Sequence, residues 1–446
     1  MKKFSLRARK TPFAWLIEKE WRELLASRAW WVMLALIGPL VGVSFISAVG
    51  TYAELSGYGG TTEGVGEAFS PLVGIWAPTF SACELAAAFL LPFVAIRVVA
   101  GDRQTGALKL ELQQPMPVFW RIAAKAIVLL AGWTIASAPT LAAVGLWRSY
   151  GGSVYPPELA AVATGHWLNA GLTIALAAAA ASLTDHPSTA AIVTLSVTVG
   201  TWILNFIAAV HGGAWELAAG YTPTAMVAEF QHGLIRLDVL LAAALLVTAG
   251  LALATVWMRL GVAVRRRAYE SVALGGVTAA AVFACTFVNV NWDLSENRMN
   301  SFPEPDEEAL TQIHGPLRIE AHLAAQDPRR VDLERHALSK LRRIVRRVQV
   351  DYVASTTTGL FEQTAQHYGE IWYELDGRRT MSRGTTAESV LEAIYSVAGL
   401  TPPPEGDRIF RGHPLAVPPK RAATVFYGIW PALVVAAGVF HWRRQA

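Results

Sequence analysis

The sequence contains 446 residues, of which 53% are hydrophobic and 16% are charged. Soluble domains carry about 25% charged residues, so this composition excludes an ordinary soluble protein and indicates a membrane protein. The net charge of +4 does not indicate nucleic-acid binding, because the arginines gather at the ends of apolar runs and in one late segment. No nucleic-acid partner is expected.

Residues 12–28 form the first predicted element, an amphipathic helix. Its polar residues lie away from one apolar stripe, which consists of Phe13, Ile17, Trp21, Leu24 and Leu25. Such a helix can lie in the plane of the membrane interface. The basic segment 1–10 lacks the apolar run and cleavage site of a signal peptide, so we expect residues 1–28 to be a cytoplasmic tail followed by this interfacial helix.

Eight apolar runs further along the chain are long enough to cross a bilayer, which takes roughly 17–25 residues. They are Trp30–Val49, Pro78–Val99, Ile122–Leu146, His166–Leu183, Thr189–Val210, Val239–Trp257, Val272–Val288 and Thr424–Phe440. We therefore predict an α-helical polytopic membrane protein with about eight spans.

The segments between these runs alternate in charge. Residues 50–77 contain three glutamates and no lysine or arginine, whereas arginines cluster at 259–267 and at Arg443 and Arg444. Basic residues favour the cytoplasmic side of a membrane. The pattern predicts a multi-pass protein of the cell (inner) membrane with both termini in the cytoplasm.

Residues 101–125 form a polar, partly basic segment between the second and third runs. The basic residues in and beside it predict a cytoplasmic location; they are Arg97, Arg103, Lys109, Arg121 and Lys125. Gly101 and Gly106 have the spacing of a phosphate-binding Walker A loop, but Ala107 and Leu108 replace its lysine and hydroxyl residue. We expect no nucleotide cofactor in this chain. An ordinary solvated loop is the alternative reading of this segment.

The same segment resembles the permease subunits of type-2 ATP-binding cassette (ABC) exporters. The matching positions are Asp102, Arg103, Thr105, Gly106, Leu108, Leu110, Leu112, Pro115 and Lys125. Those permeases also carry an interfacial elbow helix, which the segment containing Trp15, Glu18, Glu20, Trp21 and Leu24 resembles. The resemblance implies a coupling helix that docks into a separate ABC ATPase. It further implies two copies of that ATPase, which hold ATP and magnesium, and a second permease copy.

Residues 211–238, between the fifth and sixth runs, are too apolar for a free loop and too broken by glycine and proline to cross the membrane. We predict two short helices that enter the outer leaflet and return. Type-2 exporter permeases, especially those of gliding-motility and copper-enzyme-maturation systems, have a similar re-entrant element. The residues assigned to it are Glu216, Thr222, Pro223, Phe230 and Gly233.

Residues 289–423 are mixed and charged, and the topology predicts that they lie outside the cytoplasm as a small α/β domain. Periodicity predicts strands at 317–323 and 349–353, helices at 329–348 and 386–397, and a hairpin at Asp376-Gly377. One face of the first helix is basic, with Arg342, Arg343, Arg346 and Arg347. A solvated face is the ordinary interpretation, and binding of anionic lipid or an acidic extracytoplasmic protein is the sharper one.

This domain resembles, over residues 288–400, the auxiliary domain of gliding-motility ABC systems. Asp293, Ser295, Glu296 and Arg298 occupy the positions of its Asp-x-Ser/Thr-Glu-x-x-Arg motif. The second α/β half of that family is missing here. The predicted organisation is therefore a tail and elbow helix (1–28), a six-span permease (29–267), a seventh span (268–288), an auxiliary domain (289–423) and an eighth span with a cytoplasmic tail (424–446).

No catalytic or metal-binding set of residues emerges from the sequence. The histidines are scattered, and no nucleophile motif such as Gly-x-Ser-x-Gly occurs. Glu84 lies inside the second run, where it could line a transport pathway or reach the membrane interface. The sequence thus predicts a non-enzymatic permease subunit of an ABC exporter. The alternative is a mechanotransmission or assembly component that drives an extracytoplasmic partner without transport, and a membrane enzyme is the weakest reading.

Overall fold

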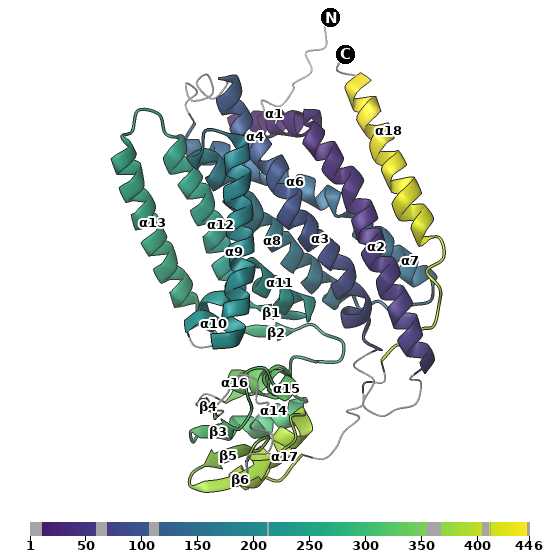
Figure 1. The fold of residues 1–446 in the computed structure, drawn as a ribbon, viewed down its shortest axis with the longest axis vertical. Helices are drawn as coiled ribbons and strands as arrows, with labels where there is room; N and C mark the ends of the chain where they lie inside the picture. Colours follow the sequence, from purple (N-terminus) through teal and green to yellow (C-terminus); the bar gives the residue numbers. More distant parts are fainter. Residues whose placement is uncertain are drawn as a thin grey trace, which may run out of the picture.

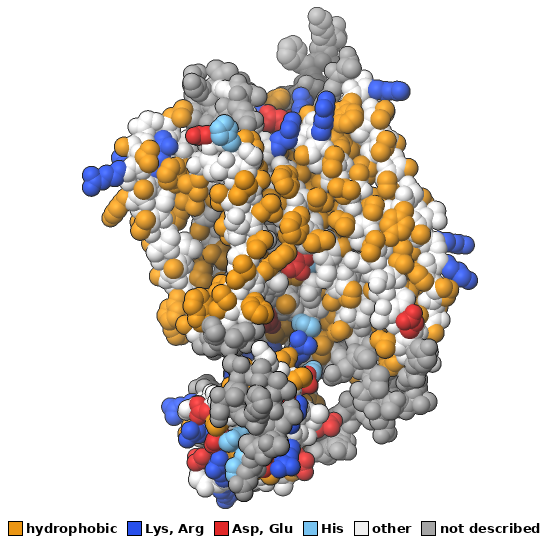
Figure 2. Space-filling view, viewed as in Figure 1, with side chains coloured by type: hydrophobic (Ala, Val, Ile, Leu, Met, Phe, Trp, Pro, Cys, Tyr) orange, Lys and Arg blue, Asp and Glu red, His pale blue; other side chains and the backbone are white. Residues whose placement is uncertain are grey.

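The computed structural model describes residues 11–58, 69–106, 116–211, 214–345, 347–353, 367–403, 410 and 412–443. In this part of the chain, eight helical segments are long and apolar enough to span a membrane, which confirms the predicted polytopic helical fold. They are Arg28–Gly57, Leu72–Asp102, Val118–Ser149, Pro156–Leu183, Pro187–Ala208, Leu237–Met258, Val264–Cys285 and Thr424–Arg443. Apolar side chains are spread over the whole visible face of this bundle, and few charged ones lie in its middle (Figure 2).

The bundle is built from long helices, several of which are interrupted (Figure 1). In chain order they are α1 (Pro12–Ala26), α2 (Arg28–Tyr58), the π-helical turn η2 (Leu72–Trp76), α3 (Ala77–Phe89), α4 (Leu91–Thr105), α6 (Val118–Ala136), α7 (Ala138–Ser149), α8 (Pro156–Leu183), α9 (Pro187–His211), α12 (Leu237–Met258), α13 (Val264–Cys285), the π-helical turn η4 (Thr424–Ile429) and α18 (Trp430–Arg443). The third span changes helix at Ser137, two residues before Pro139, whose nitrogen cannot donate to the preceding turn.

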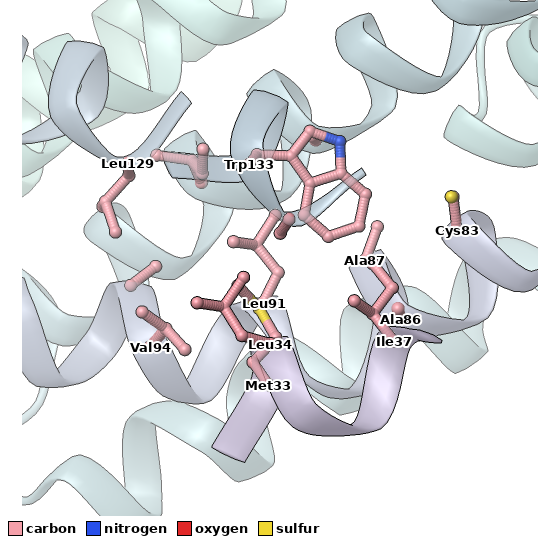
Figure 3. Packing of buried hydrophobic residues seen from close by; sticks show 14 of the residues in the cluster. Met33, Leu34, Ile37, Cys83, Ala86, Ala87, Leu91, Val94, Leu129 and Trp133 are labelled. Carbon is pink, nitrogen blue, oxygen red and sulfur yellow. The ribbon is translucent and has the colours of Figure 1, made fainter. Parts of the chain in front are cut away.

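Tightly packed apolar side chains from α2, α3, α4 and α6 fill the centre of the bundle (Figure 3). The residues labelled in that view are Met33, Leu34, Ile37, Cys83, Ala86, Ala87, Leu91, Val94, Leu129 and Trp133. Small residues let α18 approach α2 closely. A Cβ atom on Gly38 would lie 2.0 Å from Cδ1 of Trp430, and the Trp430 indole N–H donates to the Leu34 carbonyl over 2.7 Å. The absence of a side chain at Gly38 therefore allows the last span to pack closely against the first.

Two short helices, α10 (Ala214–Ala219) and α11 (Pro223–Gln231), follow α9, as predicted for residues 211–238. The sequence analysis did not anticipate what comes next. Strand β1 (Leu234–Arg236) pairs antiparallel with strand β2 (Asn291–Asp293), so that Leu234 lies opposite Asp293. This two-stranded sheet joins the segment before the sixth span to the start of the small domain.

The small domain contains a four-stranded sheet in the order β4-β3-β5-β6. Its elements are α14 (Glu304–Thr311), β3 (Leu317–Ala321), α15 (Pro328–Leu333), the π-helical turn η3 (Glu334–Leu338), α16 (Ser339–Ile344), β4 (Val348–Tyr352), β5 (Ile371–Leu375), β6 (Arg378–Ser382) and α17 (Ala387–Ala398). Strands β3 and β4 are parallel and the other pairs are antiparallel. The domain has its own buried core, which includes Leu317, Ile319, Leu338 and Ile394.

One boundary in this domain differs from its prediction. The helix predicted over 329–348 ends at Ile344, because Val345 is extended and Val348 begins β4. The apolar spacing continues from helix into strand, and tertiary pairing with β3 decides where the helix stops. Arg347 therefore precedes a strand and does not lie on the predicted basic helical face.

The ends of the bundle carry different structures. Helix α1 and the end of α18 lie at one end, together with the loop between α12 and α13, and the small domain lies at the other end (Figure 1). We call the first the α1 end and the second the domain end.

Candidate functional site

Three charged side chains from distant parts of the chain meet in the interior at the α1 end. Lys125 of α6 places its Nζ atom 2.7 Å from Glu20 Oε2 of α1 and 2.6 Å from Asp102 Oδ2 of α4. Its third contact is the Val98 carbonyl, at 3.2 Å. An ammonium group has three donors, and here each faces an oxygen. We call Glu20, Asp102 and Lys125 the charge triad.

The triad is sealed from water. The exposed fractions of its side chains are 0% for Glu20, 7% for Asp102 and 5% for Lys125. Lys19 lies at the edge of the triad. Its Nζ atom is 3.2 Å from a carboxylate oxygen of Glu20, 3.4 Å from one of Asp102 and 3.1 Å from one of Glu23. Burial raises the pKa of Glu20, and the ammonium groups of Lys125 and Lys19 oppose that rise. Two lysines thus balance two buried carboxylates, which is the condition under which buried charge is tolerated.

The local sequence explains why Glu20 turns inward. Thr11 caps α1 by accepting from the Ala14 amide, and Pro12 starts the helix. Helical spacing then places Glu20 and Leu24 on the same face, four residues apart, and both are fully buried. Gly132 of α6 leaves room for Leu24, since a Cβ there would lie 2.9 Å from Leu24 Cδ2. Burial of Leu24 against α6 therefore places Glu20, on the same face of α1, inside the bundle as well.

Glu20, Glu23 and Asp102 bring carboxylate oxygens within 4.8 Å of one another, a grouping that could hold a cation by distance alone. Lys19 and Lys125 already supply positive charge at these oxygens. The arrangement is therefore suited to holding helices together.

The other predicted elbow and coupling residues divide into two groups. In α1, Trp15 is exposed, Trp21 is half-buried and Glu18 pairs with Arg22 at 2.6 Å. The loop predicted from residue 101 begins later in the structure, because α4 continues through Asp102, Arg103 and Thr105, and Gly106 after it has a φ of +75°. The structure does not describe the side chains of Arg103 and Thr105. Residues 107–115 also lie outside the described part, and they include the predicted coupling residues Leu108, Leu110, Leu112 and Pro115.

The predicted re-entrant residues lie at the domain end. The Thr222 hydroxyl caps α11 by accepting from the Ala225 amide, with Pro223 in the first turn. Phe230 is buried against Gly165 of α8, where a Cβ would lie 2.5 Å from Phe230 Cβ. Gly233 turns the chain into β1 with a φ of +78°. The side chain of Glu216 lies outside the described part.

The domain end has its own buried carboxylate, which the sequence analysis missed. Glu158, in the first turn of α8, is 1% exposed and accepts from the Glu296 amide over 2.7 Å. The Glu296 carboxylate in turn lies 3.0 Å from Nε2 of His413, and the His413 amide donates to the Phe69 carbonyl. Asp293 and Ser295 shape the turn between them, since Asp293 accepts from the Ser295 amide and hydroxyl. We call this set, Glu158, Asp293, Ser295, Glu296 and His413, the domain junction.

The predicted basic face is largely occupied by internal partners. Arg342 pairs with Glu334 at 2.9 Å, and Arg343 donates to the Asn300 carbonyl. Burial lowers the pKa of Arg343, against the attraction of Glu229 and Asp293. Arg346 lies outside the described residues. These contacts favour a structural role for Arg342 and Arg343 over a free surface for lipid or protein.

The sequence marks some of these residues as unusual, but it does not indicate which of them pair. Glu20 interrupts an apolar face, and Asp102 and Lys125 stand at the ends of two spans, but nothing local indicates that they meet. Glu158 follows two prolines and has the sequence pattern of an ordinary acidic residue in the first turn of a helix.

Compared with known proteins, the chain matches no family model, and no curated protein matches it either.

Proposed function

We propose that the chain is the transmembrane (permease) subunit of an ABC exporter, and that a separate ATPase acts on it at the α1 end. The observation that carries the proposal is the charge triad. It links α1, α4 and α6 through one buried ammonium group, and α4 and α6 are the two helices that residues 106–117 connect in the chain. A push on that segment would move the three helices together, since sliding any one of them separates buried charges.

In this proposal residues 106–117 are the docking surface for the ATPase, and both ends of the chain face the cytoplasm. The basic residues at the α1 end agree with that orientation, among them Arg259, Arg266 and Arg267. ATP binding and hydrolysis occur in the partner, which holds ATP and magnesium. A second copy of the permease and two ATPase copies complete the transporter, and the small domain then lies outside the cytoplasm.

Replacement of residues 107–115 by a glycine-serine linker of equal length tests the docking surface. It leaves the charge triad intact, and we expect it to abolish co-purification of the co-expressed ATPase. The matched control replaces residues 260–262, in another loop at the α1 end. ATPase capture that survives the first replacement would refute this docking surface.

Cysteine labelling tests the orientation. Cys83 and Cys285 are buried and can be replaced to give a cysteine-free background. A membrane-impermeant maleimide should label Thr311→Cys, in α14, in cells whose outer permeability barrier has been opened. It should label Leu260→Cys only after the cytoplasmic membrane is lysed. The reverse pattern would invert the topology and contradict the proposal.

A second candidate function is mechanotransmission without transport, and the β1–β2 sheet together with the domain junction favours it. The β1–β2 pairing ties the start of the small domain to the segment before α12, and the Glu158 carboxylate of α8 accepts from the Glu296 amide, so movement of the bundle would reach the domain. Reconstituted vesicles separate the two functions. ATP-dependent movement of a solute supports the exporter, whereas ATP-dependent change in spacing between labels at Thr311 and Leu55 with no solute movement supports mechanotransmission.

A further inference from the structure

A partly open cavity of about 340 Å³ lies where α3, α8, α9 and α12 meet the start of α11. This volume is at the low end of the range for small-molecule pockets, about 300–1,000 Å³. Most of its wall is apolar, including Ala88, Leu172, Leu176 and Leu253. Polar side chains line the rest of it, among them Glu84, Asn169, Thr198 and Thr201.

Glu84 stands well inside its span. It follows Leu72, the first residue of that span, by about 18 Å of helix at 1.5 Å per residue, so it lies deeper than an interfacial position. Among the residues that the structure describes, no lysine, arginine or histidine forms an ion pair with it, and no hydrogen bond to its carboxylate is found. An ionisable side chain is costly inside a membrane unless it is paired. Glu84 therefore lacks a counter-charge within the described chain.

Two hydroxyls and one aromatic ring of the cavity also suit a positive ligand. The hydroxyls of Thr198 and Thr201 donate to carbonyls of their own helix, at 3.0 and 2.7 Å, so their oxygens can only accept from a ligand. Trp202 lines the same wall and packs edge-on against Phe89, with ring centroids 5.9 Å apart. Its π face attracts cations. The Glu84 carboxylate, these two hydroxyl oxygens and the indole face all attract positive charge, and the Asn169 amide in the same lining offers both a donor and an acceptor.

A second cavity gives an apolar ligand room and access. It has a volume of about 670 Å³, lies between α12 and α13, and shares Tyr221, Leu246, Gly250 and Leu253 with the first cavity. Its wall is nearly all apolar, and α13 itself is mostly exposed on the surface that would face lipid. A molecule dissolved in the bilayer could therefore enter beside α12, without passing through water.

We propose that the cavity at Glu84 binds a lipophilic monovalent cation, which enters from the bilayer and places its charge beside the Glu84 carboxylate. The apolar walls hold its hydrocarbon body, and Trp202 contributes a cation–π contact. That the bound cation is transported rests on the proposed exporter function, whereas the binding itself does not.

Binding of tetraphenylphosphonium to the purified chain in phosphatidylcholine nanodiscs, measured by equilibrium dialysis, tests the site. Tetraphenylborate has the same shape and the opposite charge, and serves as the ligand control. We expect saturable binding of the phosphonium only. Glu84→Gln should weaken it at least tenfold, whereas Glu54→Gln, which removes an exposed carboxylate from α2, should leave it unchanged.

Leu176→Trp provides a second variant that fills the cavity and leaves the carboxylate in place. It should also weaken phosphonium binding at least tenfold, with a melting temperature close to that of the unmodified chain. Three outcomes would overturn the proposal: equal binding of both ions, unsaturable uptake of the kind produced by partition into lipid, or full affinity in Glu84→Gln. The assay contains no ATPase, so its failure leaves the proposed docking surface untouched, and loss of ATPase capture does not affect this binding.

Discussion

The two ends of the bundle are both closed by buried carboxylates, but they hold their neighbours differently. At the α1 end, Glu20 and Asp102 share the ammonium group of Lys125, and charge is balanced by side chains from three helices. At the domain end, Glu158 accepts from a backbone amide, and Glu296 pairs with His413, whose side chain is 34% exposed. The first is a buried ionic contact, and the second combines turn hydrogen bonds, an amide-to-carboxylate hydrogen bond and a partly exposed Glu296–His413 pair.

This difference indicates how each end can move. Separating the α1 end would leave charge uncompensated in the interior, which costs several kcal/mol, so α1, α4 and α6 should move as one body. Opening the domain junction breaks single hydrogen bonds, each with a net value of about 0.5–1.5 kcal/mol. We therefore expect local opening at the domain end while the α1 end stays intact.

The largest expected effect is at Lys125. Among the described residues, Lys125→Met leaves Lys19 as the one lysine beside Glu20 and Asp102, and breaking such a buried pair costs about 3–5 kcal/mol. The apparent melting temperature in detergent should fall markedly. Combining Lys125→Met with Glu20→Gln and Asp102→Asn removes the buried charge and should recover most of the loss. Unchanged stability of the single variant would show that the ends do not differ as described.

Glu158 is the corresponding position at the domain end. Glu158→Leu leaves the Glu296 amide without its acceptor, which costs about 1–3 kcal/mol. Hydrogen exchange should accelerate at the Glu296 amide and the neighbouring turn, while the amides of α1 keep their protection. Glu158→Gln retains an acceptor oxygen and is the matched control. Faster exchange at the α1 end in Glu158→Leu would contradict the separation of the two ends.

Gly233 tests the β1–β2 sheet with a smaller change. Its φ is +78°, and an added Cβ would lie 3.1 Å from the Ser295 nitrogen. Since a left-handed conformation costs a residue with a side chain about 1–2 kcal/mol, Gly233→Ala should loosen this sheet. The readout is exchange of the Leu294 amide, which donates to the Gly233 carbonyl over 2.8 Å. Gly50→Ala in α2, where no atom lies within 4 Å of an added Cβ, should leave this exchange unaltered.

The smallest effect is expected at a surface pair in the small domain. Hydrogen bonds from Arg329 lower the pKa of Asp327, and Tyr368 donates to it as well. A lowered folded-state pKa stabilises the domain above the unfolded value, near pH 4, and this contribution is lost as the pH falls through the folded value. Because Arg329 is 44% exposed, we expect no more than about 1 kcal/mol.

Amide exchange of α15, corrected for the intrinsic effect of pH on exchange rates, measures this contribution. Protection should fall between pH 5 and pH 3 in the unmodified chain, and Asp327→Asn should lack that component. An identical pH response in Asp327→Asn would rule out this pair as the source.

Local patterns were sufficient for most of the secondary structure. Runs of apolar residues predicted all eight candidate spans, because hydrophobicity and length are properties of a continuous segment. The short helices α10 and α11 follow from Gly220, Thr222 and Pro223, which end one helix and cap the next. The helix predicted to reach Val348 was too long, because its apolar spacing does not distinguish the last helical turn from strand β4.

The candidate site required the fold. The sequence by itself determined that α1 is amphipathic, that the spans are apolar and that Glu84 lies within one of them, since each property depends on neighbouring residues alone. Only the tertiary structure decided that Glu20, Asp102 and Lys125 share one contact and that β1 pairs with β2. It also decided that Glu84 faces a cavity where the described residues supply no counter-charge. Those relations join residues far apart in the chain, and they depend on how the helices pack against one another.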